Sequence, residues 1–168
     1  AVAKGLAVDL AAHALRPLRD YAIDAGGDLY LAGHNPSGEA WTVGIRHPRH
    51  PDAILDRVSV SDRAVCTSGD YERRADPSAG GHHILNPADG DAATASASVT
   101  VVAATALLAD ALATAAFVMG PDAGVSLIER HGAEGLIITP TLSVVATQGF
   151  HRAYTSATPA QSGDGAAA

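Results

Sequence analysis

Hydrophobic positions along the chain predict a central buried helix. Residues 105 to 120, TALLADALATAAFVMG, consist mainly of alanine and other apolar residues, with no proline or glycine before Gly120. Thr105 can cap the start of this helix and Gly120 can end it. An almost wholly apolar helix is expected to lie inside the protein rather than on its surface.

Two further helices are expected on either side of the central one. Residues 4 to 16 have helical periodicity, and Leu6, Leu10 and Ala14 form one apolar row. A short helix is expected over residues 122 to 131, directly after the glycine that ends the central helix.

Alternating or β-branched segments predict strands between these helices. We expect strands on both sides of Gly26-Gly27 within residues 21–34, at 41–46, 56–60, 63–67, 97–103, 134–139 and 142–147, and a short strand carrying His82 to Leu85. Strands that are grouped together, with a few interspersed helices, favour an α+β fold over a doubly wound parallel sheet.

Two polar residues interrupt the central helix. Asp110 and Thr114 are four residues apart and therefore share one helix face. Their oxygens could bind a hard cation such as Mg²⁺ together with phosphate or water oxygens. In the alternative interpretation Asp110 caps a neighbouring element and Thr114 only fills the helix. Spacing alone favours this second interpretation, because such pairs are common.

Composition narrows the possible functions. The 168 residues suffice for one domain, and a net charge of -7 with 17 % charged residues argues against a nucleic-acid surface. No apolar run is long enough to span a membrane. The single cysteine, Cys66, excludes an internal disulfide, and we expect it to be a buried thiol rather than a nucleophile paired with His83.

Other polar residues have two interpretations each. Lys4, at the entry of the first helix, could face a ligand phosphate or simply be solvated. Asp24 and Asp28 flank the two glycines, and we expect both to bond turn amides. Adjacent strand residues face opposite sides, so at most one of His82 and His83 should face any given site.

Five segments, in the order AVAKGLAVD, DAGGDLY, TSGDYE, HHILNPADG and ADALATA with FVMG, resemble the C-terminal half to two-thirds of the ApbE family, the FAD:protein FMN transferases. They cover roughly residues 1 to 147. The resemblance implies a mainly antiparallel sheet around a buried central helix, with the N-terminal part of the family fold missing. It also implies use of FAD and Mg²⁺ to transfer FMN to a Thr or Ser of a target protein, with release of AMP.

The resemblance assigns metal and nucleotide roles to individual residues. Asp110 and Thr114 are expected to bind Mg²⁺, and Ala1 is expected to offer its backbone carbonyl to the metal. Lys4 is expected to lie against FAD, and Ile84 to contact the flavin nucleotide.

The resemblance also implies a base and a wall for the active site. His83 is expected to deprotonate the acceptor hydroxyl, which leaves His82 without a catalytic role. Ser68, Gly69 and Tyr71 resemble a family element that we expect to shape the active-site wall.

Domain boundaries and location are also expectations. Residues 1–150 should form the C-terminal part of a flavin transferase domain, and residues 151–168, rich in small and polar residues, a disordered tail. The chain begins without Met, so it could be a fragment that is inactive alone. The resemblance implies that relatives are often exported or lipid-anchored on the outer face of the inner membrane. We expect no N-terminal signal in this chain, so the sequence leaves its compartment unknown.

Two other activities fit the same residues. A metal-dependent FAD pyrophosphatase would release FMN and AMP without a protein acceptor. A non-catalytic FAD-binding remnant would bind FAD without turnover, even after Asp110 is replaced. The expected partners are FAD and an acceptor protein, with no nucleic acid and no membrane span in this chain.

Overall fold

A computed structural model describes residues 2–71 and 82–150 of the chain. The helices in these parts are α1 (Val2–Ala14), α2 (Ala106–Met119) and α3 (Pro121–Arg130). The strands are β1 (Tyr21–Asp24), β2 (Leu29–Ala32), β3 (Trp41–Arg46), β4 (Ile54–Val60), β5 (Arg63–Gly69), β6 (Ser98–Ala103), β7 (Glu134–Ile138) and β8 (Val144–Ala146). The predicted tail at 151–168 lies outside the described residues.

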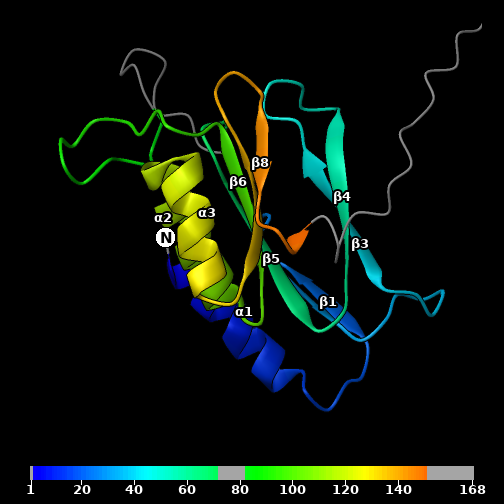
Figure 1. The fold of residues 1–168 in the computed structure, drawn as a ribbon. Helices are drawn as coiled ribbons and strands as arrows, with labels where there is room; N and C mark the ends of the chain where they lie inside the picture. Colours follow the sequence, from blue (N-terminus) through cyan, green and yellow to red (C-terminus); the bar gives the residue numbers. More distant parts are fainter. Residues whose placement is uncertain (1, 72–81, 151–168) are drawn as a thin grey trace, which may run out of the picture.

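Six of these strands form one sheet in the order β1-β2-β5-β6-β7-β8, and every neighbouring pair is antiparallel. Strands β3 and β4 form a separate antiparallel hairpin. The helices cover one face of the large sheet, and the β3–β4 hairpin lies on the other side (Figure 1). The predicted α+β class with a mainly antiparallel sheet is therefore confirmed.

The large sheet is the middle layer and has a hydrophobic core on each face. Strand β6 is buried along its whole length, as expected for a strand covered on both faces. The core on the helix side includes Val8, Val99, Val101, Phe117 and Ile137. The core on the hairpin side includes Val58, Val65, Val102, Leu136 and Phe150.

Helix α2 is the buried central helix that the sequence predicts. The Thr105 side chain accepts a hydrogen bond from the Leu108 amide, and Gly120 follows the helix with a φ of 82°, so both predicted ends are confirmed. A second cap comes from α1, where Asp9 accepts hydrogen bonds from the Ala106 and Leu107 amides at 2.7 and 2.9 Å. Two segments far apart in sequence therefore meet at the start of α2.

Helix α1 buries a different face from its leucine row. Gly5, Val8 and Ala12 are buried, whereas Leu6 and Leu10 are 48 % and 63 % exposed. A Cβ on Gly5 would lie 2.5 Å from the Ala106 carbonyl oxygen, so α1 approaches α2 too closely for a larger side chain. Small residues, rather than the leucine row, form this helix–helix contact.

The predicted strand at His82 to Leu85 is wrong. In place of a strand, His82 and Leu85 are isolated bridge residues, and Leu85 pairs with Ala92 across a turn. The His82 ring also stabilises this segment, because its Nδ1 accepts a hydrogen bond from the Ile84 amide at 3.2 Å. This segment is therefore a side-chain-stabilised loop rather than a strand.

Candidate functional site

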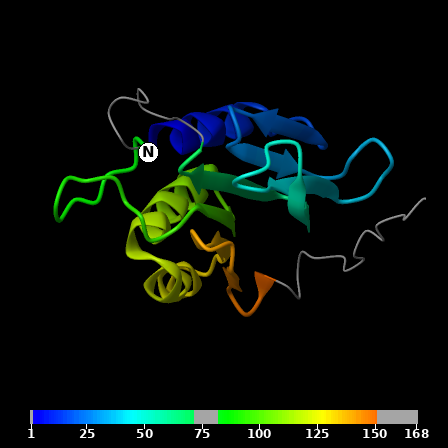
Figure 2. The same ribbon diagram turned by 90° about the horizontal axis from the view of Figure 1, so that it is seen from above.

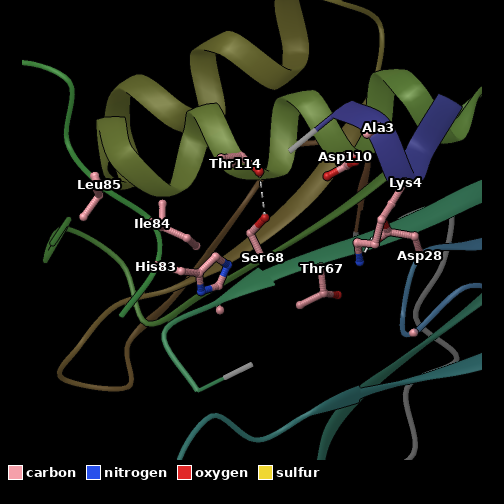
Figure 3. Close-up of a pocket in the computed structure, with 12 residues that line it drawn as sticks. Ala3, Lys4, Asp28, Thr67, Ser68, His83, Ile84, Leu85, Asp110 and Thr114 are labelled. Carbon is pink, nitrogen blue, oxygen red and sulfur yellow. Dashed lines mark hydrogen bonds and ion pairs between the residues drawn. The ribbon is translucent and has the colours of Figure 1, made fainter. Parts of the chain in front are cut away.

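A cavity of about 420 Å³ opens where the C-terminal end of β5 meets the start of α1 and the middle of α2. It collects residues from segments that are distant in sequence (Figure 3). Its lining consists of Ala3, Lys4, Gly26, Asp28, Thr67, Ser68, Gly69, His83, Ile84, Leu85, Asp110 and Thr114. Figure 2 shows the N-terminal end of α1 and the loop after residue 82 at the same end of the molecule, and both contribute to the lining of this cavity. The cavity thus contains most of the residues that the sequence singled out.

Asp110 and Thr114 both line the cavity, as their spacing predicts. Asp110 is only 6 % exposed, and its Oδ2 accepts the Gly5 amide of α1 at 3.1 Å. Thr114 Oγ1 lies 3.1 Å from Ser68 Oγ on β5, within hydrogen-bond distance. Asp110 therefore does cap a neighbouring helix, and it also faces the cavity, so the two interpretations of its role are compatible.

The surroundings of Asp110 disfavour its charge. Burial raises the pKa of the carboxyl group, and the Gly5 amide opposes that rise by bonding the ionised form. The nearby Asp28 carboxylate raises the pKa further, whereas the Lys4 ammonium lowers it. A bound cation would stabilise the ionised form of Asp110.

Lys4 and Asp28 form an ion pair inside the cavity. The distance from Lys4 Nζ to Asp28 Oδ2 is 3.1 Å, and the Asp28 side chain is 2 % exposed. The prediction for Asp28 is wrong, because its carboxylate faces the cavity instead of a turn amide. Asp24 does bond the turn, since its Oδ1 accepts the Gly27 amide at 2.9 Å. The spacing from Tyr30 was a usable signal for the direction of the Asp28 side chain, because residues two apart along an extended segment face the same side. The Tyr30 side chain packs on the helix side of the sheet, where the cavity lies.

The two histidines have different environments. His83 is exposed and lines the cavity, whereas His82 does not line it. His82 Nδ1 accepts the Ile84 amide, so Nε2, 2.8 Å from the Ala93 carbonyl oxygen, must be the protonated nitrogen. The His82 ring also packs edge-on against the Phe117 ring, with 5.4 Å between the ring centroids. His82 is thus a structural residue, and the expectation that only one of the pair faces the site is confirmed.

The wall beneath the cavity comes from the end of β5. Ser68 and Gly69 line the cavity, and Tyr71 lies behind Gly69. A Cβ on Gly69 would lie 2.6 Å from the Tyr71 ring, so a larger residue at this position would require the ring to move. Tyr71 Oη is 3.4 Å from Ser98 Oγ. Tyr71 therefore supports this wall without lining it.

Two other candidates stand apart from the cavity residues. Cys66 is 1 % exposed, and burial strongly raises the pKa of its thiol, which fits the predicted inert buried cysteine. Ala1 lies outside the described residues, so its expected carbonyl contact stays a prediction.

The donor set fits a hard cation only in part. No three His, Cys, Asp or Glu side chains in residues 2–71 and 82–150 come together as metal ligands. The cavity instead offers the carboxylates of Asp110 and Asp28 and the hydroxyls of Thr114 and Ser68. Mg²⁺ takes few protein oxygens and completes its coordination with water and substrate phosphates, so this set is compatible with it.

Comparison with known proteins identifies the family of the chain. The model of the ApbE family matches residues 1–137. The chain belongs to the ApbE family. The FAD:protein FMN transferase of Treponema pallidum is 37 % identical over 170 residues, which cover 89 % of this chain and 45 % of that protein. The FAD:protein FMN transferase of Vibrio cholerae is 30 % identical over 160 residues, 92 % of this chain and 46 % of that protein.

Solved ApbE structures have the same fold. The ApbE protein of Thermotoga maritima superposes with a TM-score of 0.81 at 36 % identity, covering 90 % of this chain and 51 % of that one. The flavin transferase ApbE from Vibrio cholerae superposes with a TM-score of 0.77 at 29 % identity, covering 89 % of this chain and 50 % of that one. The chain thus spans about half the length of the ApbE proteins that it matches.

Proposed function

We propose that the protein transfers FMN from FAD to a Thr or Ser hydroxyl of a target protein and releases AMP, in a Mg²⁺-dependent reaction. The observation that carries this proposal is the cavity in which Lys4, His83, Asp110 and Thr114 converge from α1, the 82–97 loop and α2. Membership of a family whose named members are FAD:protein FMN transferases supports the same substrate.

Asp110 and Thr114 would hold the Mg²⁺ ion, with Ser68 beside Thr114. When bound, the ion would neutralise charge on the pyrophosphate. The Gly5 amide fixes one oxygen of Asp110 at 3.1 Å, so the carboxylate is held in place before any ligand arrives.

The reaction transfers one phosphoryl-type group. The acceptor hydroxyl oxygen forms a bond to the phosphorus on the FMN side of the pyrophosphate, and the bond from that phosphorus to the AMP oxygen breaks. A ring nitrogen of His83 would take the hydroxyl proton, and AMP leaves with the bridging oxygen. The exposed position of His83 at the cavity allows a side chain of another protein to reach it.

Lys4 would supply positive charge on the opposite side of the cavity from His83. Its ammonium points into the cavity from the first turn of α1 (Figure 3). The amino-terminal end of a helix carries a partial positive charge that favours phosphate. Lys4 and the start of α1 can therefore orient the pyrophosphate between the metal ligands and the base.

The test is an incubation of the protein with FAD, Mg²⁺ and an acceptor protein that contains an exposed Thr. We expect the acceptor to gain FMN, seen as in-gel flavin fluorescence and as a mass increase, with AMP in equal amount. Transfer should be lost in Asp110→Asn and His83→Ala and retained in His131→Ala, which replaces an exposed histidine outside the cavity. Release of FMN and AMP without an acceptor would instead indicate a pyrophosphatase. FAD binding without any product would indicate a binding remnant.

A further inference from the structure

Asp28 is a buried carboxylate, and its one ion-pair partner within residues 2–71 and 82–150 is the flexible Lys4 side chain. Its side chain is 2 % exposed and lines the cavity. Lys4 Nζ lies 3.1 Å from Oδ2, but the contact lacks hydrogen-bond geometry, and no other described residue bonds this oxygen. Burying a carboxylate costs free energy that an off-axis ion pair repays only in part. Such a group is more easily explained by function than by stability.

The turn around Gly26-Gly27 does not need the Asp28 side chain. Asp24 Oδ1 accepts the Gly27 amide at 2.9 Å, and the Asp28 backbone carbonyl accepts the Ala25 amide at 3.0 Å. The turn is therefore closed by Asp24 and by main-chain atoms. The Asp28 carboxylate is left to act on the cavity.

Lys4 is the residue on which Asp28 can act. Lys4 is the only lysine in the chain, and its side chain is 41 % exposed. A half-exposed lysine has many rotamers, and fixing it on a ligand costs conformational entropy. A carboxylate beneath the ammonium removes part of that cost before the ligand binds.

We propose that Asp28 is a positioning residue, which holds the Lys4 ammonium in the cavity so that it meets the phosphates of the bound nucleotide. The consequence for binding rests on the proposed function. The positioning of Lys4 itself is a property of the chain alone and can be tested without a ligand.

Replacing Asp28 distinguishes its positioning of Lys4 from the effect of its negative charge on FAD affinity. Asp28→Asn removes one negative charge from the cavity, and this alone would strengthen the binding of an anionic nucleotide. Loss of a positioned Lys4 acts in the opposite direction. The sign of the change in FAD affinity therefore distinguishes the two effects.

The first measurement uses the single lysine. Protein labelled with ¹³C at lysine Cε gives one side-chain signal, that of Lys4. We expect this signal to report a restricted side chain in the wild type and a mobile one in Asp28→Asn, with the restriction partly regained in Asp28→Glu. Asp24→Asn is the matched control, because it alters the same turn and should leave the signal unchanged. Equal mobility in wild type and Asp28→Asn would overturn the proposal.

The second measurement is FAD affinity in the presence of Mg²⁺. We expect Asp28→Asn to weaken binding on the order of tenfold, the size expected for one charge-assisted contact. In a Lys4→Met background the same change should no longer weaken binding. Unchanged or tighter binding in Asp28→Asn, with Lys4 present, would contradict the positioning role.

The two proposals can fail separately. If the wild type does not bind FAD, the proposed function is contradicted, and the lysine signal still decides whether Asp28 positions Lys4. Melting of each variant shows that it is folded. Asp28→Asn should melt no lower than the wild type, because it removes a buried charge that is poorly compensated.

Discussion

Asp110 shows how one side chain can serve both the fold and the site. Its carboxylate accepts the Gly5 amide and faces the cavity that holds Lys4 and Asp28. The i, i+4 spacing from Thr114 was sufficient to predict the shared face from sequence. The sequence could not show that Gly5, 105 positions earlier, would bond the carboxylate, because that contact depends on tertiary packing.

The raised pKa of Asp110 predicts a pH dependence of stability. Burial makes the folded protein bind this proton more tightly than the unfolded chain does. The stabilisation is complete at pH values below the ordinary aspartate pKa and is lost as the pH rises through the raised one. An asparagine side chain does not ionise, so Asp110→Asn should not lose stability as the pH rises. Without metal, we therefore expect its unfolding free energy at neutral pH to equal or exceed that of the wild type.

Denaturant unfolding over a series of pH values, with EDTA present, measures this difference. A variant that is less stable than the wild type by roughly 2 kcal/mol at neutral pH would show that the ionised carboxylate is mainly structural. In that case the loss of activity in Asp110→Asn could not be attributed to metal binding.

Replacement of the adjacent histidines should affect different properties, stability for His82 and transfer activity for His83. His82→Ala removes contacts to the Ala93 carbonyl, the Ile84 amide and the Phe117 ring, so we expect a loss of about 1–3 kcal/mol in unfolding free energy. His83→Ala, at an exposed position, should change stability by less than about 0.5 kcal/mol and abolish transfer. Denaturant unfolding and the transfer assay check both. Intact transfer in His83→Ala would place the base elsewhere.

At the level of elements, α1 and α2 form the frame of the site by capping each other. Asp9 of α1 bonds the first amides of α2, and Asp110 of α2 bonds an amide in the first turn of α1. The extent of α2 was predictable from its apolar run and its capping residues, and periodicity placed α1 within two residues at each end. The buried face of α1 was not, because the sequence shows leucines on one side while the close contact needs Gly5.

Gly5→Ala tests this helix contact. The new Cβ would lie 2.5 Å from the Ala106 carbonyl oxygen, so the helices must separate, and we expect a destabilisation of about 1–3 kcal/mol. Leu6→Ala, at the neighbouring exposed position, is the control and should change stability little. Thermal or denaturant unfolding measures both variants. Unchanged stability in Gly5→Ala would show that the two helices can separate at no cost.

At the scale of the whole molecule, the site lies where one face of an antiparallel sheet meets two helices. The alternation of apolar and polar residues predicted most of the strands, since successive side chains of a half-buried strand face the core and the solvent in turn. It could not predict that β3 and β4 leave the large sheet and cover its other face, because strand pairing is decided by contacts between distant segments. The strand predicted at residues 82–85 is wrong for a related reason, since this segment forms isolated bridges and the His82 side chain bonds the Ile84 amide.

The molecule spans about half the length of the ApbE proteins that it matches. The described residues nevertheless bring together a cation-compatible pair on α2, a lysine on α1 and an exposed histidine on a loop.

None of the helices in residues 2–71 and 82–150 has the length and hydrophobicity needed to cross a membrane.

Flavin fluorescence during titration with FAD, with and without Mg²⁺, tests the central claim most directly. If the cavity of Lys4, Asp110 and Thr114 binds FAD through a metal, binding should require Mg²⁺ and be lost in Asp110→Asn, while Asp24→Asn binds like the wild type. Binding that is equally tight in EDTA and in Asp110→Asn, or no binding under any condition, would contradict the account.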